Sequence, residues 1–230
     1  MKNLKTLLCL FTALAPCLLF AGEGADVQKE EGFVALTNGK DLSGWKVTGG
    51  NGEFKMEDGE IVGTGRKVNA NTFLISEKTY GDFDFRFEMK FDTLDGNSGM
   101  MFRGLQKNGD GRVFGYQCEH DNGKQRAWTA GVYDEARRGW LFPDKKNKEQ
   151  CAAFTAQGQK VFKWDDWNEI RILCVGNHIQ IFMNGEKRVD FIDEHEEHST
   201  PEGFFGMQVH SGKATDVRWR NLRIKELTAE

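Results

Sequence analysis

The stretch Phe83-Asp-Phe-Arg-Phe-Glu-Met-Lys-Phe91 alternates apolar and charged residues without interruption. Successive side chains of a β-strand point to opposite faces of its sheet. The stretch therefore predicts a strand with five apolar side chains on one face and only charged ones on the other. Such a strand is typical of an antiparallel sheet that has one face in the core and one in water.

Shorter alternating runs, separated by glycine, asparagine or aspartate, flank this strand on both sides. Asp58-Gly59, Gly176-Asn177 and Asn184-Gly185 have the composition of two-residue hairpin turns. Residues 148–157, inside a polar insertion, are compatible with a short helix or a loop, and no long helical period occurs elsewhere. About a dozen short strands with almost no helix predict an all-β sandwich or barrel, and we favour a two-sheet jelly-roll β-sandwich.

The first 21 residues have the pattern of a signal peptide. Lys2 and Lys5 precede an apolar run, residues 7–20, that is short for a membrane span, and Ala21 and Gly22 are small residues suited to cleavage. Residues 22–31 lack a hydrophobic pattern and predict a flexible tail, which leaves 32–230 as a single domain. We expect a periplasmic or secreted protein with no membrane segment after cleavage. The sequence around Cys17 disfavours a lipoprotein.

Charge and cysteine content narrow the possible functions. The formal charge is −4, and removal of residues 1–21, which include two lysines and no acids, makes it about −6. Mild acidity argues against nucleic-acid binding, which requires a basic surface. The cysteines that remain are Cys118, Cys151 and Cys174, and we expect Cys118 and Cys174 to be core residues rather than a disulfide.

A second alternating stretch, Tyr116-Gln-Cys-Glu-His-Asp121, predicts a strand with a polar face formed by Gln117, Glu119 and Asp121. Gln208 and His210 form a similar polar row on a strand near the C-terminus. If the two strands lie in one sheet, amide, carboxylate and imidazole groups meet on one face. A solvated sheet face is the alternative, but amide and aromatic groups are denser here than on most exposed strands.

The polar rows allow two kinds of chemistry. Glu119, Asp121 and His210 supply oxygen and nitrogen donors that are compatible with a divalent metal of unspecified identity. Ordinary glycosidases use two carboxylates, and Glu119-x-Asp121 is spaced as in one strand of jelly-roll endoglucanases. The positions where those enzymes carry a second acid are Gly123 and Lys124 here, which weakens that hypothesis. We expect no organic cofactor.

Several motifs, taken together and in this order, resemble the 3-keto-disaccharide hydrolase domain family over about residues 32–227. They are Gly32 to Trp45 (GFVALTNGKDLSGW), Tyr80-Gly-Asp-Phe83, Asn97-Ser-Gly99 with Arg103, Gly115-Tyr-Gln117 with Glu119 and Asp121, Gly131 to Trp140 (GVYDEARRGW), Trp167-Asn168, Asn184-Gly185, Gly206 to His210 (GMQVH) and Arg218-Trp-Arg-Asn221. Many relatives carry an aliphatic residue in place of His120.

The resemblance implies a concanavalin A-like jelly roll that acts on 3-keto-glycosides, which a separate sugar 3-dehydrogenase produces. A base removes the acidic proton on C2, the group on C1 is expelled, and the resulting 3-keto-glucal is hydrated. Glu119 is the leading candidate for the base or a metal ligand, His210 and Asp121 for ligands or proton shuttles, and Glu135 for a second acid. The candidates for sugar binding are Asn97, Arg103, Gln117, Arg137, Arg138, Trp140 and Gln208. A non-catalytic carbohydrate-binding module or lectin is the first alternative, and a conventional glycosidase is the second.

Overall fold

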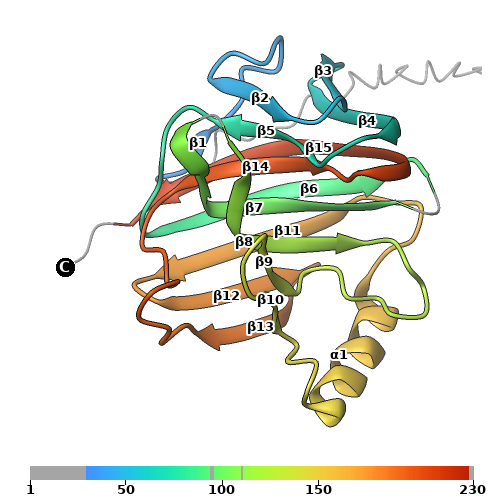
Figure 1. The fold of residues 1–230 in the computed structure, drawn as a ribbon, viewed down its shortest axis with the longest axis vertical. Helices are drawn as coiled ribbons and strands as arrows, with labels where there is room; N and C mark the ends of the chain where they lie inside the picture. The colour runs from blue at the N-terminus through green and yellow to red at the C-terminus, as the bar shows by residue number, and fades with distance from the viewer. Residues whose placement is uncertain (1–29, 94–95, 110, 228–230) are drawn as a thin grey trace, which may run out of the picture.

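The structure is a computed structural model that describes residues 30–93, 96–109 and 111–227. The predicted signal peptide and residues 22–29 of the predicted tail lie outside this part. The described residues form two antiparallel sheets that pack face to face (Figure 1). This arrangement confirms the predicted all-β sandwich.

The first sheet has eight strands. Its order is β13 (Glu186–Ile192), β12 (His178–Met183), β11 (Asn168–Val175), β6 (Phe83–Phe91), β15 (Gly212–Glu226), β4 (Glu60–Val68) and β3 (Glu53–Glu57), and β1 (Val34–Ala35) pairs with β15. The second sheet has seven strands. Its order is β10 (Gly139–Phe142), β9 (Val132–Glu135), β8 (Val113–Asp121), β7 (Asn97–Gln106), β14 (Phe204–Val209), β5 (Thr72–Ser76) and β2 (Trp45–Gly49).

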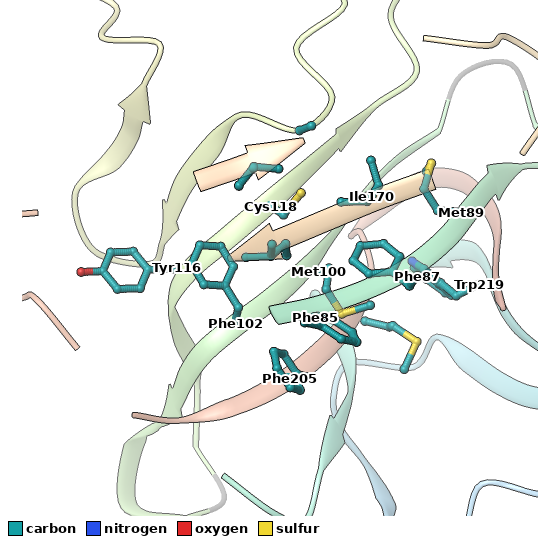
Figure 2. Packing of buried hydrophobic residues seen from close by; sticks show 14 of the residues in the cluster. Phe85, Phe87, Met89, Met100, Phe102, Tyr116, Cys118, Ile170, Phe205 and Trp219 are labelled. Atoms are coloured by element: carbon teal, nitrogen blue, oxygen red, sulfur yellow. The ribbon is translucent and has the colours of Figure 1, made fainter. Parts of the chain in front are cut away.

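The core lies between the sheets, and β6 contributes to it as its alternation predicts. All five of its apolar side chains are buried, whereas its charged side chains face the other way. Phe85 stacks on Phe205 of β14, in the opposite sheet, with ring centroids 4.1 Å apart (Figure 2). Phe83 adds an edge contact to the Phe205 ring at 4.9 Å. Aromatic packing of this kind supplies much of the buried apolar area of a sandwich.

The last two strands of the chain occupy central positions. β14 lies between β7 and β5 in the second sheet, and β15 lies between β6 and β4 in the first. Each sheet is therefore completed by a strand that comes more than 100 residues after at least one of its neighbours in the sequence.

The predicted hairpins are all present. Asp58-Gly59 joins β3 to β4, and Gly176-Asn177 and Asn184-Gly185 join β11, β12 and β13 into a meander. The polar insertion contains a helix, α1 (Lys148–Val161), which begins where Asn147 accepts a hydrogen bond from the backbone N–H of Gln150. No helix among the described residues is long and apolar enough to cross a membrane.

The described cysteines are free thiols, and Cys118 and Cys174 are buried in the core as predicted. His120 lies beside Cys118 on the same strand and is also fully buried. Its ring lies 5.8 Å from that of Phe87 and 6.5 Å from that of Trp219, and neither ring nitrogen has a hydrogen-bond partner. Burial lowers the pKa of His120 to about 4, so the imidazole is neutral in the folded protein at pH 7.

We expect His120→Leu to stabilise the protein, and more so at pH 5 than at pH 8. The substitution removes two unpaired nitrogens whose burial costs about 1–3 kcal/mol. The folded pKa lies below that of an unfolded histidine, so the wild type loses stability as the pH falls from about 6.5 towards 4, and the variant does not. Urea unfolding at both pH values measures the difference. His195, which is exposed in a loop, provides a control, His195→Leu. A variant less stable than the wild type at both pH values would contradict the prediction.

Candidate functional site

The outer face of the second sheet carries the polar row of β8. Gln117 and Glu119 point away from the core, whereas Tyr116, Cys118 and His120 point into it, as the alternation predicts. β7 pairs with β8 on one side, so that Gly99 lies opposite Glu119 and Asn97 opposite Asp121. β9 pairs on the other side and places Tyr133 opposite Gln117.

β14 lies in the same sheet, which confirms that the two predicted polar rows share one face. Met207 pairs with Met100 of β7, and continuing this register places Gln208 beside Gly99. Gly99 thus lies between Glu119 and Gln208 with no side chain of its own. A Cβ atom there would lie 2.4 Å from Cδ of Gln117, which shows that the Gln117 side chain lies over the glycine.

Gln208 is a buried amide whose oxygen and nitrogen both lack a hydrogen-bond partner among the described residues. Buried polar atoms are nearly always paired, and an unpaired one costs free energy. A ligand hydroxyl would donate to the oxygen, and a hydroxyl or carbonyl oxygen of a ligand would accept from the nitrogen. This arrangement therefore indicates a polar binding site beside Glu119.

Glu119 is 5% exposed, and its burial raises its pKa to about 7. The amide of Asn97 donates a hydrogen bond of 2.7 Å to the Glu119 carboxylate and opposes this rise, whereas the negative charge of Asp121 adds to it. Arg126 lies 3.9 Å from the carboxylate and also lowers the pKa. A carboxylate that titrates near pH 7 can accept and release a proton under physiological conditions.

Glu135 on β9 is a further buried acid of this face. Burial raises its pKa, while Arg112 at 3.8 Å and the amide of Asn71 at 3.3 Å oppose the rise. Asn71 lies next to β5, which is four strand spacings, about 19 Å, from β9 in a flat sheet. Their contact shows that the sheet curls around this face and forms a hollow.

Arg126 is the cation closest to Glu119. Its Nε atom donates to Asp121 at 2.7 Å, and its guanidinium carbon lies 5.4 Å from the ring centroids of both Trp128 and Trp140. Trp140 makes edge contacts with Trp128 at 4.6 Å and with Tyr133 at 5.5 Å. An aromatic wall and a guanidinium thus border the polar face, a combination that suits sugar rings.

A buried arginine from the opposite sheet holds the loop that carries Arg126. Arg188 of β13 donates to the carbonyl oxygens of Ala127, Thr129 and Phe154 and to the side chain of Gln157. All five guanidinium N–H groups are used in this way. The loop and helix α1 are thereby fixed to the sandwich.

The three predicted sugar-binding arginines all lie outside this group. Arg103, at a bulge of β7, is buried and binds Asp82 and two main-chain carbonyl oxygens. Arg137 and Arg138 both bind Asp134, which points to the opposite face of β9 from Glu135. These ion pairs hold loops together, so we leave the three arginines out of the proposed site.

The three predicted metal ligands do not converge. Asp121 accepts hydrogen bonds from Arg126 and from the backbone N–H of Gly123, and Nδ1 of His210 is bonded to the carbonyl oxygen of Ser211. No group of three His, Cys, Asp or Glu side chains in the described ranges is placed to hold a metal ion. The arrangement of Glu119, Asp121 and His210 therefore does not fit a metal centre.

The structure adds four residues that the sequence did not single out, namely Asn71, Arg112, Arg126 and Tyr133. Tyr133 shares its strand face with Glu135, so alternation along residues 132–135 is a signal that would have found it. Asn71, Arg112 and Arg126 lie in loops, where no periodic pattern marks a functional side chain.

Comparison with known proteins supports a carbohydrate-related role. The sequence model of the 3-keto-alpha-glucoside-1,2-lyase-like domain matches residues 32–225, which confirms the resemblance seen in the motifs. No curated protein matches this sequence.

Solved structures share the fold at low identity. A putative glycosyl hydrolase from Parabacteroides distasonis is 22% identical with a TM-score of 0.59, over 89% of this chain and 98% of that one. A protein of unknown function with a galectin-like fold from Bacillus subtilis is 9% identical with a TM-score of 0.59, over 82% and 92%. The carbohydrate binding module CBM66 from Bacillus subtilis is 15% identical with a TM-score of 0.52, over 80% and 96%. At these identities the likeness shows the fold alone, and it confirms the concanavalin A-like class.

We expect Glu119→Gln to stabilise the folded protein at pH 8. The folded pKa of about 7 lies above the ordinary 4.5, so the wild type loses stability as the pH rises through this interval, by about 3 kcal/mol in full. Glutamine keeps an oxygen for Asn97 and carries no charge. Urea unfolding should show a gain over the wild type at pH 8 that shrinks below pH 5.

The control is Glu194→Gln in an exposed loop, for which no such pH-dependent gain is expected. A Glu119→Gln gain that is the same at pH 5 and pH 8 would show that the carboxylate is not held at a raised pKa.

Proposed function

This chain belongs to the family of 3-keto-alpha-glucoside-1,2-lyase-like domains, and we propose that it cleaves 3-keto-glycosides by elimination across C1 and C2. The family and the hollow polar face indicate a carbohydrate-active protein. The observation that carries the finer proposal is Glu119, a buried carboxylate with a pKa of about 7 among amide side chains that suit sugar hydroxyls.

Glu119 acts as the base. The ketone at C3 acidifies the hydrogen on C2, and the Glu119 carboxylate removes it as a proton, which leaves an enolate over C2, C3 and the C3 oxygen. A positioned base of matched pKa contributes about 10²–10⁴ in rate. Asn97 fixes the orientation of the carboxylate through its hydrogen bond of 2.7 Å.

Donors around Glu119 stabilise the negative charge on the C3 oxygen. The Arg126 guanidinium, 3.9 Å from the Glu119 carboxylate, supplies positive charge. The Gln208 amide is buried and unpaired, so it is free to donate to the sugar. Donors fixed in a water-poor site stabilise a developing oxyanion more than water does.

Glu135 acts as the acid for the leaving group. Its raised pKa favours the protonated form, which gives its proton to the glycosidic oxygen as the C1–O bond breaks. The products are 2-hydroxy-3-keto-glucal and the free alcohol. Hydration then follows in the same site: Glu135 takes a proton from the water that adds to C1, and Glu119 returns the proton that it had taken to C2.

No step of this mechanism passes through a metal, because the predicted donors Glu119, Asp121 and His210 do not converge. The substrate must be oxidised at C3 beforehand, so the proposal requires a sugar 3-dehydrogenase as a metabolic partner. The predicted signal peptide would place the reaction in the periplasm or outside the cell.

We expect Glu119→Gln to lower kcat/KM for a 3-keto-glucoside by at least about 10²-fold, because the base is lost. The wild-type rate should rise with pH through about 7, as the carboxylate of Glu119 loses its proton. Release of a chromogenic alcohol from C1 measures both. The Glu194→Gln control should retain the wild-type rate and profile. Retained activity in Glu119→Gln would overturn the assignment of the base.

The unoxidised parent glucoside distinguishes the alternative functions. Cleavage of the keto sugar alone supports elimination, whereas cleavage of the parent supports a conventional glycosidase. Binding of both sugars without cleavage supports a carbohydrate-binding module. Activity that is lost with a chelator and restored by a divalent metal would show that a metal completes the site.

We further expect Glu135→Gln to slow the cleavage of substrates with poor leaving groups more than that of substrates with good ones. A proton donor matters most when the departing oxygen is strongly basic. The rate of release of an alkyl alcohol should therefore fall more than that of an acidic phenol. Comparison of kcat/KM for matched alkyl and nitrophenyl 3-keto-glucosides measures the difference. An equal fall in kcat/KM for the two substrates would show that Glu135 is not the acid.

A further inference from the structure

A cavity of about 520 Å³ opens on the hollow face of the second sheet, beside the Glu119 group. Phe73 of β5 and Val113 of β8 line its floor, and Asn71, Arg112 and Glu135 line its polar side. Glu119, Gln117 and Gln208 do not line it. The cavity is therefore a second compartment that shares Glu135 with the proposed reaction site.

The floor belongs to a separate apolar cluster on this outer face. Its five buried members are Phe73, Ile75, Met101, Val113 and Phe204, and none of them belongs to the core between the sheets. An apolar floor beneath an open cavity favours a ligand with an apolar face.

The polar side chains at the cavity are already largely paired with one another. The Asn71 oxygen accepts from the backbone N–H of Ser211 at 2.8 Å, and its nitrogen donates to Glu135. Glu135 also faces Arg112. Asn71 and Glu135 thus have little capacity left for the hydroxyls of a second sugar ring, and Arg112, whose side chain is 73% exposed, keeps N–H donors at the rim.

We propose that this cavity receives the leaving group, and that it selects a flat apolar one such as an aryl or benzyl group. The inference rests on the proposed function, because the acid Glu135 must touch the oxygen that departs from C1. The group attached to this oxygen then extends into the compartment that Glu135 lines. The Phe73 and Val113 floor contacts its apolar face, and Arg112 contacts a polar substituent at the rim.

Benzyl and ethyl 3-keto-glucosides test this proposal, because both release alcohols of similar acidity. We expect a KM at least about tenfold lower for the benzyl compound, the order that burial of one aromatic ring provides. Ala70→Trp, at an exposed residue that lines the cavity, should fill it and abolish most of this preference. The readout is the ratio of the two KM values, because Ala70 lines the cavity that receives either leaving group.

Val175→Trp is the matched control, because it adds the same indole at an exposed position of the other sheet. Equal KM values for the benzyl and ethyl compounds, or a benzyl preference that Ala70→Trp leaves intact, would overturn the proposal. A lower KM for a 3-keto-disaccharide than for the benzyl compound would overturn it as well.

Equilibrium binding separates failure of this proposal from failure of the proposed function. If the wild type cleaves neither compound, the elimination mechanism is wrong, and calorimetry with unoxidised benzyl and ethyl glucosides still tests the cavity. Tighter binding of the benzyl glucoside that Ala70→Trp abolishes supports the cavity as an aryl site. Equal affinities for the two glucosides overturn it.

Discussion

The two-residue alternation of β8 joins the proposed site to the core of the sandwich. Each site residue of this strand is flanked by core residues, so that Glu119 stands between Cys118 and His120. A shift of the strand by one residue would exchange the two faces and bury Glu119 between the sheets. The register that packs the core therefore also fixes which groups face the sugar, and the position of Glu119 follows from the burial of its neighbours.

The same burial sets the chemistry of the face. The charge of Glu119 is less compensated than that of Asp121, because Arg126 lies 2.7 Å from Asp121 and 3.9 Å from Glu119. Its carboxylate is therefore a stronger base than an exposed one, and the folded state is less stable for holding it charged. Arg188 reinforces this arrangement from the opposite sheet, since its hydrogen bonds fix the loop from which Arg126 reaches the site. The burial that makes Glu119 a stronger base therefore also lowers the stability of the folded protein.

Periodic signals predicted most of the fold, and they predicted the site only where it lies on strands. Alternation placed Gln117, Glu119 and Gln208 on one face, and glycine turns placed the hairpins. It did not predict the contact between Asn71 and Glu135, because curvature of a sheet depends on tertiary packing. The arginines were harder still. Nothing in the sequence around Arg103 and Arg138 distinguishes them from Arg126. In the structure Asp82 binds Arg103 and Asp134 binds Arg138, and Arg126 is the arginine that lies near Glu119.

The central positions of β14 and β15 also constrain how the molecule is made. Because each of these strands separates two others that come much earlier in the sequence, neither sheet is continuous until the segment from Phe204 to Glu226 has joined it. Contacts between residues so distant in sequence form slowly, since long loops must close first. A chain released from the ribosome N-terminus first thus has two incomplete half-sheets with unpaired edges, and acquires Gln208 only in the last stage of folding.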